Sequence, residues 1–182
     1  MTHIWLVRHA QTTVSGVCYG QSDVPVQPGP AEAARAIALQ WQQTGQHRPP
    51  RLWTSPWLRT QSIAAELAGL WRVPLRVDAR LSELSFGVWE GREYDEIART
   101  DAARWHHWTQ NYERAAPPEG ETIAQLGARV ASWLDEQSSA TSDVLAVTHA
   151  GVMRTARALI AHQPYTSVIT AAVPHLQLEQ LR

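Results

Sequence analysis

The chain has 182 residues, 44% of them hydrophobic and 18% charged, which predicts a single packed domain over 1–182 and excludes a disordered chain. Its 16 Lys+Arg and 17 Asp+Glu leave a net charge of −1, which argues against the basic, clustered surface of a nucleic-acid-binding protein. All 16 cations are arginine, so a Walker A phosphate loop and a lysine Schiff base are excluded as well.

The first half of the chain alternates between short apolar runs, which predict buried strands, and helix-forming stretches. The predicted strands are 4–7, 51–54 and 74–77, and the predicted helices are 31–44 and 55–69. Ser55 is the expected N-cap of the second helix, with Pro56 at its first position. Residues 10–30, rich in Gly and Pro, and residues 80–91 predict structured loops.

The second half continues the alternation. Residues 92–111 are polar and rich in tryptophan, which predicts one or two surface helices. Residues 122–125 carry a capping-box pattern that predicts the start of a helix. Residues 143–148 are the most strand-like run, a helix is expected from Gly151, and the alternating leucines of 176–181 predict an edge strand.

Strands separated by helices imply right-handed crossovers. The predicted fold class is therefore α/β, a three-layer α/β/α sandwich with a mostly parallel central sheet.

Two absences in the sequence bear on location. Residues 1–8 contain no basic stretch followed by a long apolar run, and no apolar run approaches the roughly 18 residues of a membrane span. Cys18 is the single cysteine, which excludes an intramolecular disulfide and a cysteine-rich zinc site. We expect a cytoplasmic protein with no membrane or nucleic-acid partner, and either a monomer or a homodimer.

Ionisable residues follow three of the predicted strands. Arg8 and His9 follow the first, Arg59 lies one helical turn beyond the second, and His149 follows the strand over 143–148. Ligands of open α/β sheets bind at the carboxyl ends of the strands, and arginine matches phosphate oxygens bidentately. A single Arg-His pair is expected about 0.7 times by composition, and a lone histidine at a strand end is more often structural. The anion site is therefore predicted by the combination of these arginines and histidines after successive strands, and not by any one of them.

Four segments resemble the motifs of the histidine phosphatase superfamily, also called the phosphoglycerate mutase-like family. They are residues 6–12 (LVRHAQT), 54–60 (TSPWLRT), 81–91 (LSELSFGVWEG) and 147–154 (VTHAGVMR). Their order matches that of the family. The resemblance implies a phosphoglycerate mutase-like fold and an enzyme of the histidine acid-type phosphatase class, a phosphoric monoester hydrolase.

The resemblance also implies the roles of the residues. His9 would be the nucleophile that forms a phosphohistidine, with Arg8, Arg59 and His149 on the phosphoryl oxygens and Glu83 as the general acid. The two arginines would disfavour a charged imidazolium and keep His9 neutral. Further substrate or phosphate contacts are expected at Thr12, Ser15, Gly20, Gln21 and Ala150. No cofactor and no metal are expected.

The sequence departs from the family pattern in places. Ala10 replaces a glycine, Ser15 stands where many relatives have an asparagine that contacts phosphate, and Ile63 stands where the family often has threonine. Arg154 is as consistent with lining the site as with a helix surface, and Trp89 is a candidate wall of the pocket.

Residues 19–26 and 116–122 resemble the alpha-ribazole phosphatase branch most closely. This implies a phosphomonoesterase acting on a small phosphorylated substrate, alpha-ribazole 5'-phosphate in cobalamin biosynthesis. Two alternatives stay open: a broad-specificity sugar-phosphate phosphatase or phosphoglycerate mutase, and a non-catalytic member that only binds phosphorylated ligands.

Overall fold

The computed structural model describes residues 3–46, 50–139 and 141–181. Within these ranges five strands form a central sheet in the order β5-β4-β6-β1-β7. The strands are β1 Ile4–Arg8, β4 Arg51–Thr54, β5 Leu75–Val77, β6 Val144–Thr148 and β7 Leu178–Gln180. β1, β4, β5 and β6 are mutually parallel, and β7 pairs with β1 in the antiparallel sense. The predicted mostly parallel sheet and its edge strand near the C-terminus are confirmed.

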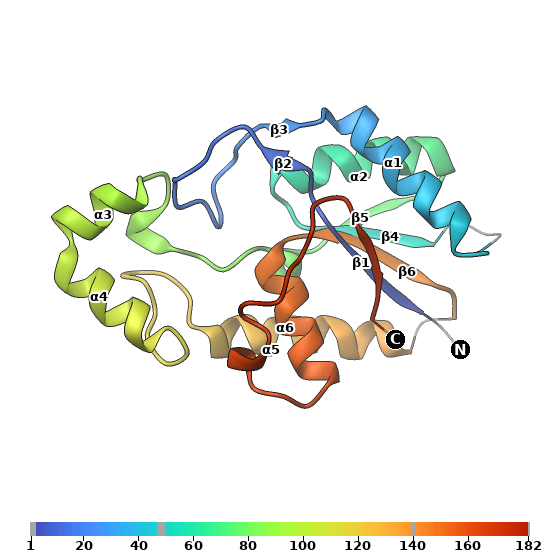
Figure 1. The fold of residues 1–182 in the computed structure, drawn as a ribbon. Coiled ribbons are helices and arrows are strands. Elements are labelled where there is room, and N and C mark those ends of the chain that lie inside the picture. Colours follow the sequence, from blue (N-terminus) through green and yellow to red (C-terminus); the bar gives the residue numbers. More distant parts are fainter. Residues whose placement is uncertain (1–2, 47–49, 140, 182) are drawn as a thin grey trace.

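Helices cover both faces of this sheet (Figure 1). One layer consists of α1 Pro30–Gln43 and α2 Leu58–Trp71, and the opposite layer of α5 Ile123–Ser138 and α6 Ala150–Ile160. Two further helices, α3 Tyr94–Thr100 and α4 Ala102–Asn111, lie to one side of the layers. The α/β/α sandwich is therefore confirmed, and residues 92–111 form two helices as predicted.

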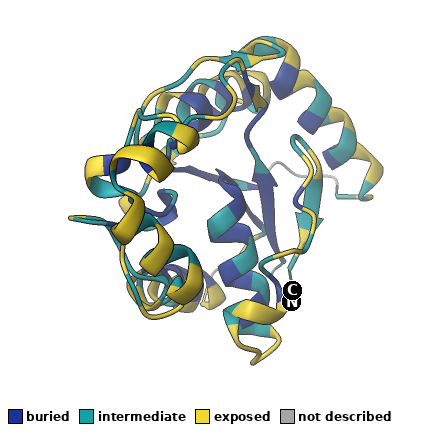
Figure 2. Cartoon of the chain, turned by 60° about the vertical axis from the view of Figure 1, so that its left-hand side comes forward, coloured by how far each residue is buried: buried dark blue, intermediate teal, exposed yellow. Residues whose placement is uncertain are grey.

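The sheet divides the core in two because successive side chains of a strand point to opposite faces. In β1, Ile4 and Leu6 pack in the core on the α5/α6 side, whereas Trp5 and Val7 pack in the core on the α1/α2 side. Burial is concentrated in the strands and on the sheet-facing sides of the helices (Figure 2). A rigid double core of this kind fixes the positions at which the parallel strands end.

Several local predictions hold. The capping box forms at the start of α5, where the Thr122 hydroxyl accepts from the Gln125 amide and the Gln125 side chain accepts from the Thr122 amide. The loop over 10–30 contains a short antiparallel pair of strands, β2 Gln11–Thr12 and β3 Val26–Gln27, of two residues each. The loop over 80–91 is braced by short 3₁₀ helices at Ala79–Leu81 and Gly87–Trp89, and a third lies at Tyr165–Ser167.

Candidate active site

Three neighbouring strands deliver the predicted phosphate-handling residues to one edge of the sheet. Since β4, β6 and β1 are adjacent and parallel, their carboxyl ends meet at the same edge. His9 directly follows β1 and His149 directly follows β6. Their ring centroids lie 5.3 Å apart, and the His9 amide donates to the Thr148 carbonyl at 3.1 Å.

The environment of His9 defines its reactive nitrogen. Its Nδ1 lies 2.6 Å from the Ala10 carbonyl oxygen. A carbonyl can only accept, so Nδ1 carries the proton and Nε2 keeps its lone pair in the neutral ring. The pKa of His9 is lowered to about 3, and burial is the largest cause. The hydrogen bond to Ala10 raises this pKa, whereas the charges of Arg59 and Arg8 lower it further. His9 is thus neutral at pH 7, with burial outweighing the charges that the sequence points to.

His149 is completely buried, and a hydroxyl pair holds it. Its Nε2 lies 2.7 Å from the Ser55 hydroxyl, which lies 2.6 Å from the Thr60 hydroxyl. Burial first, and then the charge of Arg59, holds the pKa of His149 well below its usual value. Its other ring nitrogen, Nδ1, is buried with no partner in the described part of the chain.

The expectation that Ser55 is the N-cap of α2 is wrong. The helix begins at Leu58, and its first amide donates to the carboxylate of Asp23 at 2.7 Å. Ser55 Oγ lies 3.4 Å from the Trp57 amide, a long contact beside its 2.7 Å bond to His149. A partner 94 residues away therefore displaces the local capping role.

The two arginines are partly fixed by backbone carbonyls. Arg8 donates to the Val173 carbonyl at 2.9 Å, and Arg59 donates to the carbonyls of Gly20 and Ser22. Burial lowers the pKa of each guanidinium, and the nearby Glu83 opposes this in both. The Nε of each arginine is buried without a partner among the described residues. Both guanidinium groups therefore keep donor capacity that an anion at this edge of the sheet would use.

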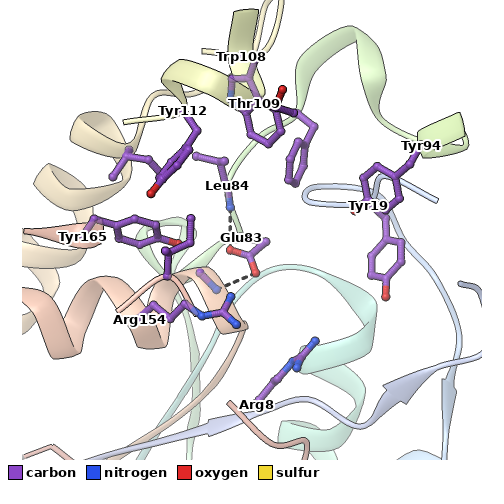
Figure 3. Close-up of a pocket in the computed structure, with 14 residues that line it drawn as sticks. Arg8, Tyr19, Glu83, Leu84, Tyr94, Trp108, Thr109, Tyr112, Arg154 and Tyr165 are labelled. Atoms are coloured by element: carbon purple, nitrogen blue, oxygen red, sulfur yellow. Dashed lines mark hydrogen bonds between the residues drawn. The ribbon is translucent and has the colours of Figure 1, made fainter. Parts of the chain in front are cut away.

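Glu83 is held against the start of α6. Its carboxylate accepts from the Leu84 amide and from the Gly151 amide, each at 3.0 Å (Figure 3). Its backbone carbonyl accepts from the Gln21 side chain and from Arg129, each at 3.0 Å. A β-carbon added at Gly151 would lie 2.1 Å from Glu83 Oε1, so only glycine leaves room for the carboxylate in this position.

Of the other residues predicted to contact substrate or phosphate, some lie at the site and some do not. Gly20 and Gln21 lie at the site through their bonds to Arg59 and Glu83, and Ala150 is the first residue of α6. The Thr12 hydroxyl donates to the Val14 carbonyl and lies 2.6 Å from the Tyr19 hydroxyl. Ser15 is exposed in the loop between β2 and β3.

A cavity of about 460 Å³ extends from Arg8 and Glu83 toward α4 (Figure 3), and His9, Arg59 and His149 are not among the residues that line it. Arg8, Glu83 and Arg154 line its charged end, which places Arg154 on the cavity wall. Its walls are mostly aromatic and aliphatic: Tyr19, Leu84, Phe86, Tyr94, Trp108, Tyr112, Ile123, Tyr165 and Ile169.

Trp89 is not among the residues that line this cavity. It is fully buried, donates from its indole N–H to Asp101 at 2.8 Å, and packs 5.7 Å from the ring of Trp108. Trp108, which belongs to α4, lines the cavity instead, and Trp89 packs against its ring.

Two further residues organise the site and were not predicted to do so. The Glu90 carboxylate accepts from the amides of Gly20, Gln21 and Phe86 and from the Ser22 hydroxyl, which joins the two loops. Arg129 of α5 holds the carbonyls of the 80–83 loop. Glu90 lies in a motif that the sequence singles out, but its partners come from a segment about 70 residues away, and no sequence signal marks Arg129.

Cys18 is no competing nucleophile. It is fully buried, and burial raises the pKa of its thiol to about 12. The described residues contain no group of three or more His, Cys, Asp or Glu that could hold a metal ion.

Comparison with known proteins decides the family. The family model of the histidine phosphatase superfamily (branch 1) matches residues 4–182. The chain belongs to the histidine phosphatase superfamily. The family motifs on which the resemblance rested are the segments that meet at the carboxyl edge of the sheet.

Individual relatives of this histidine phosphatase differ in their named activities. The adenosylcobalamin/alpha-ribazole phosphatase of Salmonella typhimurium is 27% identical, over 97% of this chain and 86% of the relative. The probable phosphoglycerate mutase GpmB of Yersinia enterocolitica is 31% identical, over 82% and 70%. The crystal structure of the alpha-ribazole phosphatase from Shigella flexneri has a TM-score of 0.86 at 23% identity, over 98% and 89%. Within the described ranges, each helix is too short or too polar to cross a bilayer.

Proposed function

We propose that this histidine phosphatase is a phosphomonoesterase that works through a phosphohistidine at His9. The observation that carries the proposal is the state of His9: a buried, neutral ring whose Nδ1 proton is fixed by the Ala10 carbonyl and whose Nε2 is free. A neutral imidazole with one oriented lone pair is the form of histidine that attacks phosphorus.

In the first step, His9 Nε2 attacks the phosphorus, the bond from phosphorus to the ester oxygen breaks, and the alcohol leaves. Arg8 and Arg59 neutralise the charge on the phosphoryl oxygens, where positioning and electrostatics supply most of the catalysis. The Thr60 hydroxyl donates to the Trp57 carbonyl at 2.8 Å, so it accepts from Ser55, and Ser55 in turn accepts from His149 Nε2. These hydrogen bonds fix the His149 ring beside His9.

Glu83 supplies the proton. It protonates the departing ester oxygen in the first step, and in the second it takes a proton from the water that attacks the phosphohistidine. Inorganic phosphate leaves, and His9 and Glu83 return to their starting states. The amides of Leu84 and Gly151 hold the Glu83 carboxyl at the cavity that would receive the alcohol.

For the substrate we propose alpha-ribazole 5'-phosphate, which would make the protein a cytoplasmic enzyme of cobalamin biosynthesis. Two observations favour it: the named activities of the relatives in Salmonella and Shigella, and the aromatic walls of the cavity. A flat bicyclic base can stack on Phe86, Trp108 or Tyr165, and such contacts contribute about 0.5–1.5 kcal/mol each beyond burial. A sugar phosphate or phosphoglycerate offers no apolar surface to these walls.

A substrate panel tests both levels of the proposal. The purified protein should hydrolyse p-nitrophenyl phosphate, and His9→Ala should abolish this. Among natural esters, kcat/KM for alpha-ribazole 5'-phosphate should exceed that for ribose 5-phosphate by about tenfold or more, equivalent to about 1.4 kcal/mol. Trp108→Leu should reduce this preference and leave ribose 5-phosphate turnover unchanged.

The panel also separates the alternatives. Equal turnover of many sugar phosphates would favour the broad-specificity phosphatase, and interconversion of phosphoglycerates would favour the mutase. Binding of phosphate without any turnover would favour the non-catalytic member.

A further inference from the structure

A segment near the C-terminus, residues 173–176, lies along the Arg8–His9 dipeptide. Arg8 donates from its side chain to the Val173 carbonyl at 2.9 Å, and its own carbonyl accepts from the Leu176 amide at 3.0 Å. Between these contacts, His175 Nδ1 lies 2.7 Å from the carbonyl oxygen of His9. His175 has no part in the steps described above, yet it touches the backbone of the nucleophile.

The direction of this hydrogen bond is fixed by its acceptor. The His9 carbonyl can only accept, so His175 Nδ1 carries a proton and donates it. The two imidazole rings lie 5.4 Å apart, centroid to centroid, at an interplanar angle of 56°. His175 is half-buried, and its contact with His9 is to the backbone carbonyl and not to the ring nitrogen that would attack phosphorus.

The His9 carbonyl belongs to the peptide unit that joins His9 to Ala10. The orientation of this unit governs where the next carbonyl, that of Ala10, points. The Ala10 carbonyl in turn accepts from His9 Nδ1 at 2.6 Å and sets the direction of Nε2. The amide of His9 is already held by Thr148. Without a donor on the His9 carbonyl, this peptide unit loses the hydrogen bond that sets its orientation, and any rotation of the unit would move the ring with it.

We propose that His175 is a positioning residue: its Nδ1–H fixes the peptide after His9 and thereby aims Nε2 of the nucleophile at the phosphorus. This inference rests on the proposed role of His9. Because a misplacement of about 1 Å can cost on the order of 10²-fold in rate, the effect belongs in kcat and not in phosphate affinity. The cations that bind the phosphoryl group keep their own contacts when the imidazole is removed.

Three substitutions of one side chain test the donor. In His175→Asn, the amide nitrogen stands the same number of bonds from Cβ as Nδ1 does, so it can donate to the same carbonyl. In His175→Gln, the amide nitrogen lies one bond further out, and His175→Ala has no donor. Gln177→Ala, at the exposed position that directly follows this segment, is the matched control.

On p-nitrophenyl phosphate, His175→Ala should lower kcat by about 10- to 100-fold with KM and the inhibition constant of inorganic phosphate within twofold of wild type. His175→Asn should recover most of kcat, His175→Gln should not, and Gln177→Ala should match wild type. The inference is overturned if His175→Asn is as slow as His175→Gln, or if kcat falls only together with phosphate affinity. The Asn–Gln comparison decides the question even where the alanine variant does not fold.

His9→Ala in the same assay separates a failure of the positioning role from a failure of the proposed function. If His9→Ala stays active, the proposed function fails. If His9→Ala is inactive and all three His175 variants match wild type, only the positioning role fails.

Discussion

Gly151 offers a way to move the general acid without changing its chemistry. A β-carbon at this position would lie 2.1 Å from Glu83 Oε1, against a limit of 3.0 Å that real β-carbons essentially never cross. In Gly151→Ala the carboxyl must therefore shift by roughly 1 Å, and a displacement of that size can cost about 10²-fold in rate. The nucleophile and the phosphate-binding arginines keep their contacts.

Two substrates separate the effect on the acid from a general loss. An alkyl phosphate needs a proton on its leaving oxygen, whereas p-nitrophenolate leaves readily without one. General acid catalysis contributes about 10²–10⁴-fold, so kcat/KM of Gly151→Ala should fall by about 10²-fold on ribose 5-phosphate. On p-nitrophenyl phosphate it should change by less than about fivefold.

Stability supplies the control. Gly127 lies within α5 with no atom close to an added β-carbon. Gly127→Ala should therefore raise the free energy of unfolding by about 0.5–1 kcal/mol through helix propensity and leave both activities intact. Gly151→Ala should remain folded with unchanged cooperativity. Equal losses on both substrates, or no loss on the alkyl phosphate, would refute the placement of Glu83 as the acid.

Three further outcomes are expected. Glu83→Gln removes the proton that the carboxyl would transfer. In steady-state kinetics, kcat/KM should therefore fall by about 10²–10⁴-fold on alkyl phosphates and much less on p-nitrophenyl phosphate. Activity should be unchanged in excess chelator, because arginines supply the positive charge; loss of activity that zinc or magnesium restores would contradict this. The pKa of His9 falls from 6.5 to about 3 on folding, so between these pH values the unfolded chain binds more protons than the folded chain. The free energy of unfolding should therefore decrease on acidification from pH 6.5 toward pH 3. His9 contributes up to about 1.4 kcal/mol per pH unit to this decrease. Urea titrations should show a flatter decrease for His9→Asn, and an equal slope would contradict the shift.

The sequence is informative where local pattern and topology decide the structure. Apolar runs locate the strands because a buried parallel strand needs little else. Once β4, β6 and β1 are parallel neighbours, the residues after them must meet, and this brings His9 and His149 together. The Thr122–Gln125 capping box forms because both of its partners lie within one helical turn.

The sequence is uninformative where a partner from elsewhere takes over a side chain. Ser55 has the local signature of a cap but bonds to His149, and the cap comes from Asp23. The partners of Glu90 and of His175 likewise lie in distant segments. No local pattern encodes such pairings, and burial, which dominates the pKa of His9, also follows only from packing.

The covalent intermediate tests the central claim most directly. Wild-type protein mixed briefly with p-nitrophenyl phosphate, quenched and mapped by mass spectrometry of its peptides, should carry one phosphoryl group on His9. The linkage should be labile in acid and stable in base, and His9→Ala should carry none. Phosphate on His149 or on a serine, or full turnover with no phosphoenzyme, would contradict the account.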